Sequence, residues 1–204
     1  QRQLLLTQSE GLVSRFQSLN DRLDSQRANI ENELESAVAS INSLSLSLAE
    51  LNISIGIATG AGQGDEPNEL LDTRDEVLRQ LAEFVSVTTI PQGGDGQISV
   101  FIGNGQALVI GSEAGQLSTA SSPEDSTRLD ISLTSSGVAQ IITDELTGGK
   151  IGGLLDFRDN DLADAINSLG RIALVMSDTI NEQHALGMDL ESNLGGLFFN
   201  DVND

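Results

Sequence analysis

The chain has 204 residues and carries 31 acidic side chains against ten basic ones, which gives a formal net charge of −21. This charge disfavours nucleic acid and anionic membrane surfaces as partners, because both are bound through clustered Lys and Arg. The absence of cysteine excludes disulfides and cysteine-based metal sites. We interpret the acidity as a source of solubility and self-repulsion, with cation binding as the alternative.

The first predicted element is one long helix between Leu12 and Ile55, a stretch of 44 residues without glycine or proline. At a rise of about 1.5 Å per residue it would reach roughly 65 Å. An apolar residue returns at every seventh position, which is typical of a helix that packs along partner helices. The positions of this series are Phe16, Leu23, Ile30, Ala37, Leu44 and Leu51.

A second sevenfold series lies beside the first and changes its offset near Gln26 and Arg27. It comprises Leu12 and Leu19, then Leu34, Ile41, Leu48 and Ile55. The change predicts that the helix meets a different partner on either side of this point. From Ser36 to Ser54 the helix is rich in serine and nearly free of charge, so we expect this half to pack on more than one face.

A glycine-rich connection from Gly56 to Gly64 is expected to end the long helix and turn the chain. The next segment begins with two acids and Pro67 in the first predicted turn, as helix N-termini prefer. Its apolar residues keep helical spacing as far as Val85, so we predict a second helix that ends near Phe84 to Ser86.

The period then becomes alternating, and β-branched residues predict five strands. Their ranges are 87–90, 98–102, 107–110, 129–133 and 138–142. Asn104-Gly105 predicts a hairpin with a type I′ turn. The segment from Gly111 to Thr127 is predicted to be a long loop. Residues 87–148 are thus interpreted as a small antiparallel β domain.

Helical spacing returns from about Ile151 to Leu186, and sevenfold series mark this segment too. One series is Leu155, Leu162, Leu169 and Met176, and its companion is Ile166, Ala173 and Ile180. We therefore predict an α+β protein in which both ends of the chain form an elongated antiparallel helical bundle, or rod, with the β domain inserted at its tip or flank.

The predicted domains are a discontinuous helical rod, 1–86 and 149–190, the inserted β domain, 87–148, and a loop, 191–204, that leads into a missing further domain. The chain begins with Gln1 already inside a helical pattern, so we expect it to be a trimmed fragment. No stretch of 18 apolar residues and no secretory signal is present in it.

Candidate chemistry is sparse. His184 is the only histidine and falls near a predicted helix C-terminus, where a structural or surface role is expected. The acidic run from Asp156 to Asp164 lacks the glycine and the glutamate of an EF-hand loop. The glycine clusters match neither a Walker sequence nor a dinucleotide fingerprint. We therefore predict a protein that is not an enzyme and has no catalytic residue, cofactor or metal.

One sequence is repeated near the start of two predicted helices: LLDTRD at Leu70–Asp75 and LLDFRD at Leu154–Asp159. It is interpreted either as a coincidence of good first-turn chemistry, or as a sign that Arg74 and Arg158 form ion pairs with carboxylates of the neighbouring helix. Both interpretations remain open at this point.

At these residues the chain resembles the flagellar hook-associated protein 1 family, the first of two junction proteins between the bacterial hook and filament. The resemblance covers about residues 50–200 and rests on three stretches in matching order: PNELLDTRDEVLRQLAEFVSV, FIGNGQALVIG and GGKIGGLLDFRDNDLADAINSLGRIALVMSDTINEQHALGMDL. The short Gly/Asp loop that ends at Phe198 and Phe199 is similar too.

The resemblance implies an extracellular, structural subunit of the flagellum, exported by the flagellar type III apparatus without a cleaved signal. It implies a ring of subunits between hook protein and the second junction protein, while this fragment is expected to be monomeric in solution. Flagellin or the second junction protein is the alternative within the same class, and an acidic surface adhesin or binding module is the alternative outside it.

We expect the structural and interaction surfaces to involve apolar residues of the sevenfold series and the two repeated arginines. These candidates are Phe16, Leu23, Ile30, Leu44, Leu51, Arg74, Leu155, Arg158, Leu162, Leu169 and Met176.

Overall fold

The computed structural model describes residues 2–60, 67–135, 137–189 and 192–200 of the chain. The chain divides into two compact units. We call residues 29–157 the strand-bearing unit, and residues 1–28 together with 158–204 the terminal unit. Helix α1 (Arg2–Gly60) contributes to both.

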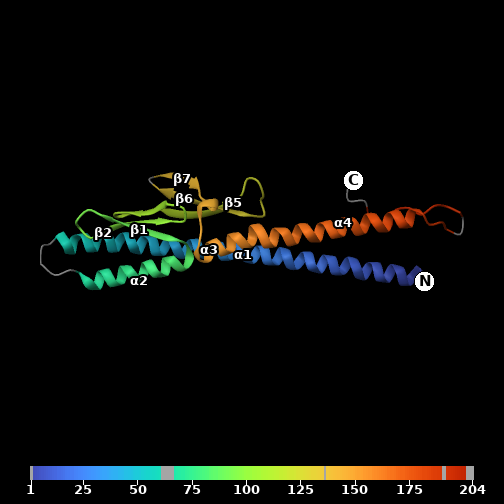
Figure 1. The fold of residues 1–204 in the computed structure, drawn as a ribbon, viewed down its shortest axis with the longest axis horizontal. Coiled ribbons are helices and arrows are strands. Elements are labelled where there is room, and N and C mark those ends of the chain that lie inside the picture. The colour runs from blue at the N-terminus through green and yellow to red at the C-terminus, as the bar shows by residue number, and fades with distance from the viewer. Residues whose placement is uncertain (1, 61–66, 136, 190–191, 201–204) are drawn as a thin grey trace. The chain divides into compact units, whose positions relative to one another are not determined.

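In the strand-bearing unit, the second half of α1 is followed by α2 (Asn68–Phe84), seven strands and α3 (Gly149–Asp156). Figure 1 shows α2 antiparallel to α1, with the strands along one flank of α1. The core is made by apolar side chains of α1, α2, α3 and several of the strands, including Leu48, Leu81, Val100, Ile131 and Ile151, which are essentially inaccessible to solvent.

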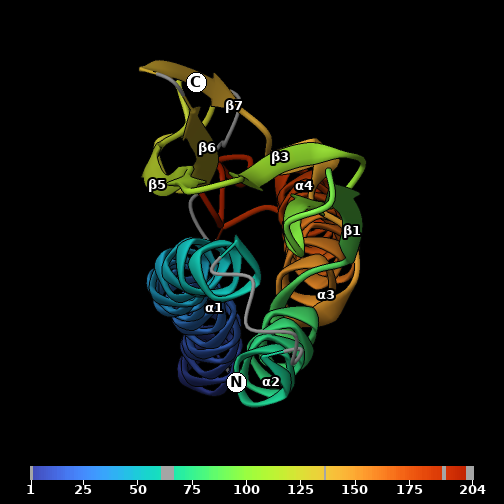
Figure 2. The ribbon, with the colours of Figure 1, turned by 90° about the vertical axis from the view of Figure 1, so that its left-hand side faces the viewer.

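The strands form two antiparallel sheets. Strands β1 (Val87–Gln92), β2 (Gln97–Ile102), β3 (Gln106–Ile110) and β4 (Glu113–Ala114) make one sheet in that order. Strands β5 (Gln116–Ser121), β6 (Leu129–Ser135) and β7 (Val138–Ile141) make the other. Figure 2 shows both sheets on the same side of α1. The prediction of an α+β fold with inserted antiparallel strands is confirmed.

The predicted loop from Gly111 to Thr127 is wrong, because it contains β4 and β5. The sequence of β5, QLSTAS, has a single large apolar residue, Leu117, and no alternation to mark a strand. Its pairing depends instead on β6, from Gln116 opposite Thr134 to Ser121 opposite Leu129. A strand held by a distant neighbour leaves little local signal.

The β2–β3 hairpin is present, but its predicted type I′ turn is wrong. Ile102 pairs with Gln106, so three residues form the loop. The positive φ angles belong to Gly103 (54°) and Gly105 (105°), and not to Asn104. The Asn104 N–H donates to the Glu145 carbonyl at 2.8 Å. The turn is therefore shaped by contact with the segment before α3 as well as by its own sequence.

The helix bounds also differ from those predicted. Helix α1 begins at Arg2 and continues to Gly60, through the first part of the expected glycine-rich connection. The remainder of that connection lies outside the described residues. Pro67 precedes α2 and is not in its first turn. The single helix expected over 151–186 is divided into α3, a π-helical turn (Phe157–Leu162) and α4 (Ala163–Ala185).

In the terminal unit, α4 runs antiparallel to the first half of α1 (Figure 1), and the described residues 186–189 and 192–200 form a folded tail. An isolated bridge joins Met188 to Leu194, and Ser192 adopts a positive φ of 68°. The two compact units divide the chain differently from the rod and β domain expected from sequence, since one unit includes both helices and strands. The rod-and-insertion division stays a prediction.

Candidate assembly surfaces

The buried face of α1 in the strand-bearing unit follows the second sevenfold series. Leu34, Ile41, Leu48 and Ile55 have no exposed surface. Of the first series, Ile30 and Ala37 are buried, whereas Leu44 and Leu51 are only half-buried. Two candidate interaction residues, Leu44 and Leu51, thus lie at the border of the packed face.

Two asparagines attach this face of α1 to the strands. The Asn42 Nδ2 donates to the Leu117 carbonyl at 2.9 Å, and its Oδ1 accepts from the Leu117 N–H at 2.8 Å. Asn52 is fully buried and donates to the carbonyls of Ile98 and Gly111, both at 2.7 Å. Its Oδ1 accepts from the Ile98 N–H at 3.2 Å. Each side-chain amide therefore donates to the carbonyl and accepts from the N–H of a strand residue, as the backbone of a neighbouring strand would.

Sequence reasoning missed these asparagines. The available signal is that Asn42 and Asn52 interrupt an uncharged, apolar part of a helix, where a buried polar group needs a specific partner. That signal indicates a polar contact but not the strand that supplies it, because the partners are 75 and 46 residues away.

A different side of the same helix leaves apolar side chains exposed. Leu46 and Ile53, seven residues apart, are 59% and 43% exposed, and Ile57 is 68% exposed. By length and composition alone α1 contains a stretch that could cross a membrane, but a third of that stretch is buried. We interpret α1 as a core helix with an additional apolar strip, which we define as Leu46, Ile53 and Ile57.

Arg74 does not form the ion pair that one interpretation of the LLDTRD repeat expected. Its Nη1 donates to the Gly96 carbonyl at 2.7 Å, and it has no salt bridge with any described residue. Gly96 has a φ of 77° and lies against Ile55 of α1. Arg74 thus links α2 to the β1–β2 turn through a carbonyl.

Arg158 lies in the π-helical turn and is buried, with only 4% of its surface exposed. Its Nε donates to Asp159 Oδ1 at 2.7 Å, which holds the guanidinium beside a carboxylate of the same turn. A buried arginine needs such a counter-charge. Leu155 of α3 and Leu162, the last residue of this turn, are also buried.

Helix α2 exposes a row of carboxylates, which we call the acidic face of α2. It comprises Glu69, Asp72, Asp75, Glu76 and Glu83. Within it, Arg79 contacts Glu76 at 2.8 Å and Glu83 at 2.6 Å. Hydrogen bonds from Arg79, and then from Gln80, lower the pKa of the Glu76 carboxyl to about 2, and the same carboxylates raise the pKa of Arg79.

In the terminal unit the sevenfold candidates of α1 and α4 are partly covered. Phe16, Leu23, Leu169 and Met176 are all half-buried. On the outer side of α4, Ile172 and Val175 are 53% and 64% exposed. These four side chains are thus only partly covered, and α4 carries further exposed apolar surface. That they form a seam between the two helices stays a prediction.

The tail folds onto the last turns of α4. The Asn181 Oδ1 accepts from the N–H groups of Phe198 and Phe199, both at 2.8 Å, and its Nδ2 donates to the Phe199 carbonyl at 3.0 Å. The exposed His184 has its Nδ1 2.7 Å from the Gly196 carbonyl and its ring 5.4 Å from that of Phe198. These contacts agree with a structural histidine.

The described residues do not bring candidate metal ligands together. Within the ranges that the structure covers, no group of three or more His, Asp or Glu side chains could hold a metal ion. The carboxylates from Asp156 to Asp164 lie on α3, the π-helical turn and the start of α4. What the arrangement offers is a set of helix surfaces for contact with other proteins.

Comparison with known proteins identifies these surfaces as belonging to a known domain. Residues 1–199 match the family model of the flagellar hook-associated protein FlgK helical domain. The chain is 38% identical over 200 residues to flagellar hook-associated protein 1 of Salmonella typhimurium, covering 97% of the chain and 36% of the relative. The corresponding Escherichia coli protein is 36% identical with the same coverage.

A solved structure also matches. It is the flagellar hook junction protein FlgK from Burkholderia pseudomallei, with a TM-score of 0.83 and 34% identity, over 91% of this chain and 34% of that one. The chain thus spans about a third of the length of the relatives it matches. The matched region starts at residue 1, well before the stretches on which the sequence resemblance rests.

Proposed function

Because the chain belongs to the family of the flagellar hook-associated protein FlgK helical domain, we propose that its protein is a structural subunit of the bacterial flagellum at the junction between hook and filament. The observation that carries this proposal is the family match over 199 of 204 residues. The relatives reported above are named as hook-associated protein 1, which favours this assignment over flagellin or the second junction protein.

The surfaces of the chain support a role in assembly. The apolar strip Leu46, Ile53 and Ile57 lies on a helix whose opposite side is already packed, so it is available to another chain. Ile172 and Val175 add exposed apolar area in the terminal unit. Exposed apolar side chains grouped along helices are typical of protein contact surfaces.

In this proposal the subunits form a ring that touches hook protein on one side and the second junction protein on the other. The protein acts outside the cell and reaches the flagellum through the type III export apparatus without a cleaved signal. It has no catalytic role. The 204-residue chain alone is monomeric in solution, since a net charge of −21 gives separate copies a net repulsion.

Three measurements test this proposal and its alternatives. Immunogold labelling of the protein in cells should place label as a single band between hook and filament, and label along the whole filament would instead favour flagellin. Light scattering of the 204-residue chain should give one subunit, and a stable ring would contradict the expected monomer. Titration with calcium tests the adhesin alternative, which sub-millimolar binding would support.

A further inference from the structure

We propose that neighbouring copies of this chain contact each other through a basic strip on one copy, Arg15 and Arg22 of α1, and the acidic face of α2 on the next copy. This inference rests on the proposed function, because it assigns residues to the contact between subunits of the ring. Both surfaces are thus covered by other copies of the same chain.

The distribution of charge along the chain is the first argument. The 129 residues from 29 to 157 hold 19 of the acidic residues and four of the basic ones, a net charge of −15. Residues 1–28 hold four arginines and three acids, a net charge of +1. An acidic chain that assembles with itself must place its cations against the acids of its neighbour, and the start of α1 is where the cations are concentrated.

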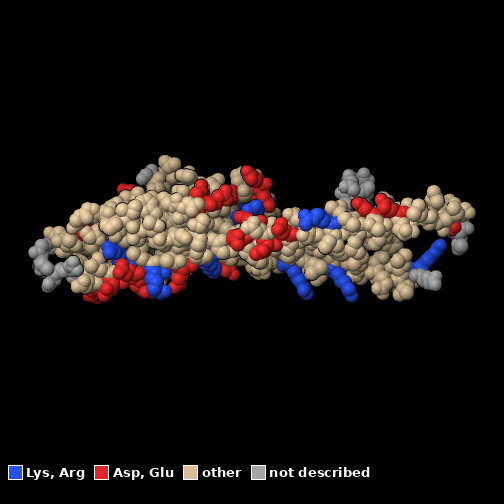
Figure 3. Space-filling view, in the orientation of Figure 1, with Lys and Arg blue, Asp and Glu red and all other residues tan. Residues whose placement is uncertain are grey.

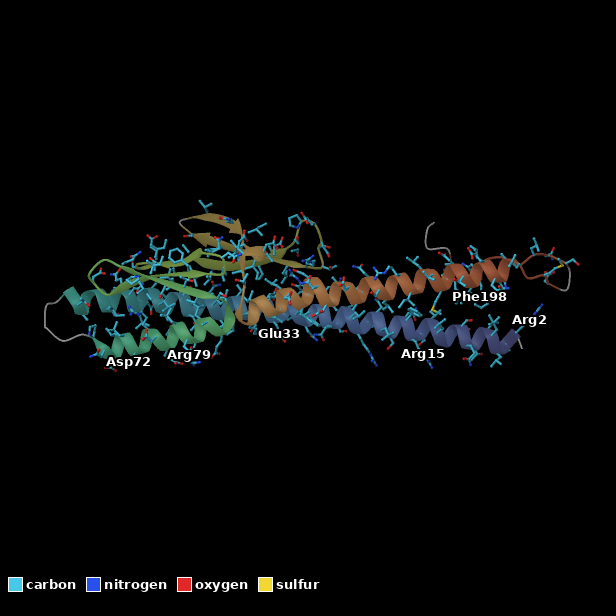
Figure 4. All side chains as sticks on the ribbon, in the orientation of Figure 1. Arg2, Arg15, Glu33, Asp72, Arg79 and Phe198 are labelled. Carbon is cyan, nitrogen blue, oxygen red and sulfur yellow. The ribbon has the colours of Figure 1, made fainter. Side chains whose placement is uncertain are left out.

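The basic strip is free to make such a contact. Arg15 and Arg22 are exposed and seven residues apart, so they share one side of α1. Neither has a salt bridge with a described residue, whereas the nearby Arg27 is paired with Asp24 at 2.7 Å. Figure 4 shows Arg15 extending from the ribbon into solvent, and Figure 3 shows basic side chains standing out from the surface of α1.

The acidic face of α2 offers the complementary partner. Glu69, Asp72 and Asp75 are exposed and have no cation partner among the described residues. Glu69 and Glu76 are seven residues apart, so their spacing of about 10 Å along the helix matches that of Arg15 and Arg22. Of these two carboxylates, Glu76 also contacts Arg79 of its own helix at 2.8 Å. With Arg79 included, the five carboxylates leave a net charge of −4. Acidic side chains gather over α2 in Figure 3.

The contact joins two different surfaces of the same chain. Such a heterologous contact repeats from copy to copy and closes into a ring when the rotation permits. Charge complementarity disfavours a contact of acidic face with acidic face, or of basic strip with basic strip. The head-to-tail arrangement follows from the proposed ring, since a two-fold contact would close after two copies.

Crosslinking tests the inference directly, because the chain has no cysteine of its own. Cells that express the full protein as a mixture of Arg22→Cys and Asp72→Cys chains, and that carry filaments, are treated with a short bis-maleimide. A mixed crosslinked dimer is the expected result. The control replaces Arg22→Cys by Arg171→Cys, another exposed arginine, on α4. No mixed dimer, or equal crosslinking of the control, would overturn the inference.

Charge exchange provides a second test. Arg15→Glu with Arg22→Glu should weaken subunit association by at least about tenfold, since like charges then face each other. Adding Glu69→Arg and Asp72→Arg to the same chain should restore association. Arg171→Glu should have little effect. Failure of the four-substitution chain to recover, with its circular dichroism and melting unchanged, would contradict the inference.

The two proposals fail in different ways. If gold label lies at the junction but the crosslink is absent, the assigned surfaces are wrong and the junction role stands. If label lies elsewhere in the flagellum, the junction role is wrong whatever the crosslinks show.

Discussion

Asn42 and Asn52 illustrate how single side chains can attach a sheet to a helix. Each amide bonds both the N–H and the carbonyl of one strand residue, so the helix satisfies backbone groups that would otherwise be buried without partners. Because these contacts join segments far apart in sequence, they determine where the strands lie along α1.

Replacing Asn52 tests this role. Asn52→Ala leaves the buried N–H and carbonyl of Ile98 and the half-buried carbonyl of Gly111 without their partner. We expect a loss of about 3 kcal/mol in the free energy of unfolding, or roughly 10 °C in Tm. Thermal unfolding followed by circular dichroism measures it. The exposed Asn32→Ala is the control and should change stability by less than about 0.5 kcal/mol. An Asn52 variant that melts like this control would contradict the role.

The Glu76–Arg79 contact predicts a pH effect. The pKa of Glu76 is lowered to about 2 from its ordinary 4.5, so the contact stabilises the folded state above about pH 4.5 and is lost as the pH falls to about 2. Arg79→Ala should return the pKa of Glu76 toward its ordinary value, as followed by NMR titration of the carboxyl. Glu69, without such a contact, is the internal control. An unchanged low pKa in the variant would show that Arg79 is not the cause.

At the scale of elements, the spacing of apolar residues predicted the helices and strands that are determined by their own sequence. The long helix, α2, and the strands with β-branched alternation follow from spacing that is visible in the sequence. Strand β5 and the π-helical turn do not follow from local spacing. Strand β5 depends on β6 and Asn42. Residues Phe157–Leu162 keep a helical sequence pattern, but their backbone takes the i→i+5 hydrogen bonding of a π-helix in place of the i→i+4 bonding of an α-helix.

For the candidate surfaces, the sequence predicted which residues take part but not how deeply they are buried or what they contact. The sevenfold residues were identified as packing positions, but which series is fully buried depends on the strands that cover Leu48 and Ile55, and spacing alone does not show this. Arg74 and Arg158 were marked by the LLDTRD and LLDFRD repeat, yet their surroundings differ: one bonds a turn carbonyl and the other a carboxylate in its own turn.

The junction between α2 and α3 depends on glycine. Gly149 has a φ of 55°, and a Cβ there would lie 2.4 Å from the backbone of Phe84 and Val85. Gly149→Ala should therefore cost more than about 2 kcal/mol. Gly153, in the same helix, has an ordinary φ and open space around it, so Gly153→Ala should stabilise by about 0.5–1 kcal/mol. Chemical denaturation compares them, and equal effects would contradict this account.

At the scale of the whole molecule, the chain combines a strongly acidic strand-bearing unit with a helical start that is slightly basic. Its apolar strip, and Arg15 and Arg22, which have no salt bridge with a described residue, are surfaces that the fold leaves uncovered. A protein that acts alone gains little from them, whereas a subunit that contacts neighbours along its helices uses both.

Deletion of the complete gene, with complementation, tests the central claim most directly. Electron microscopy and swimming assays should show hooks without stable filaments and a loss of motility in the deletion strain, with both restored by the intact gene. Normal filaments on normal hooks in the deletion strain would contradict a role at the hook–filament junction.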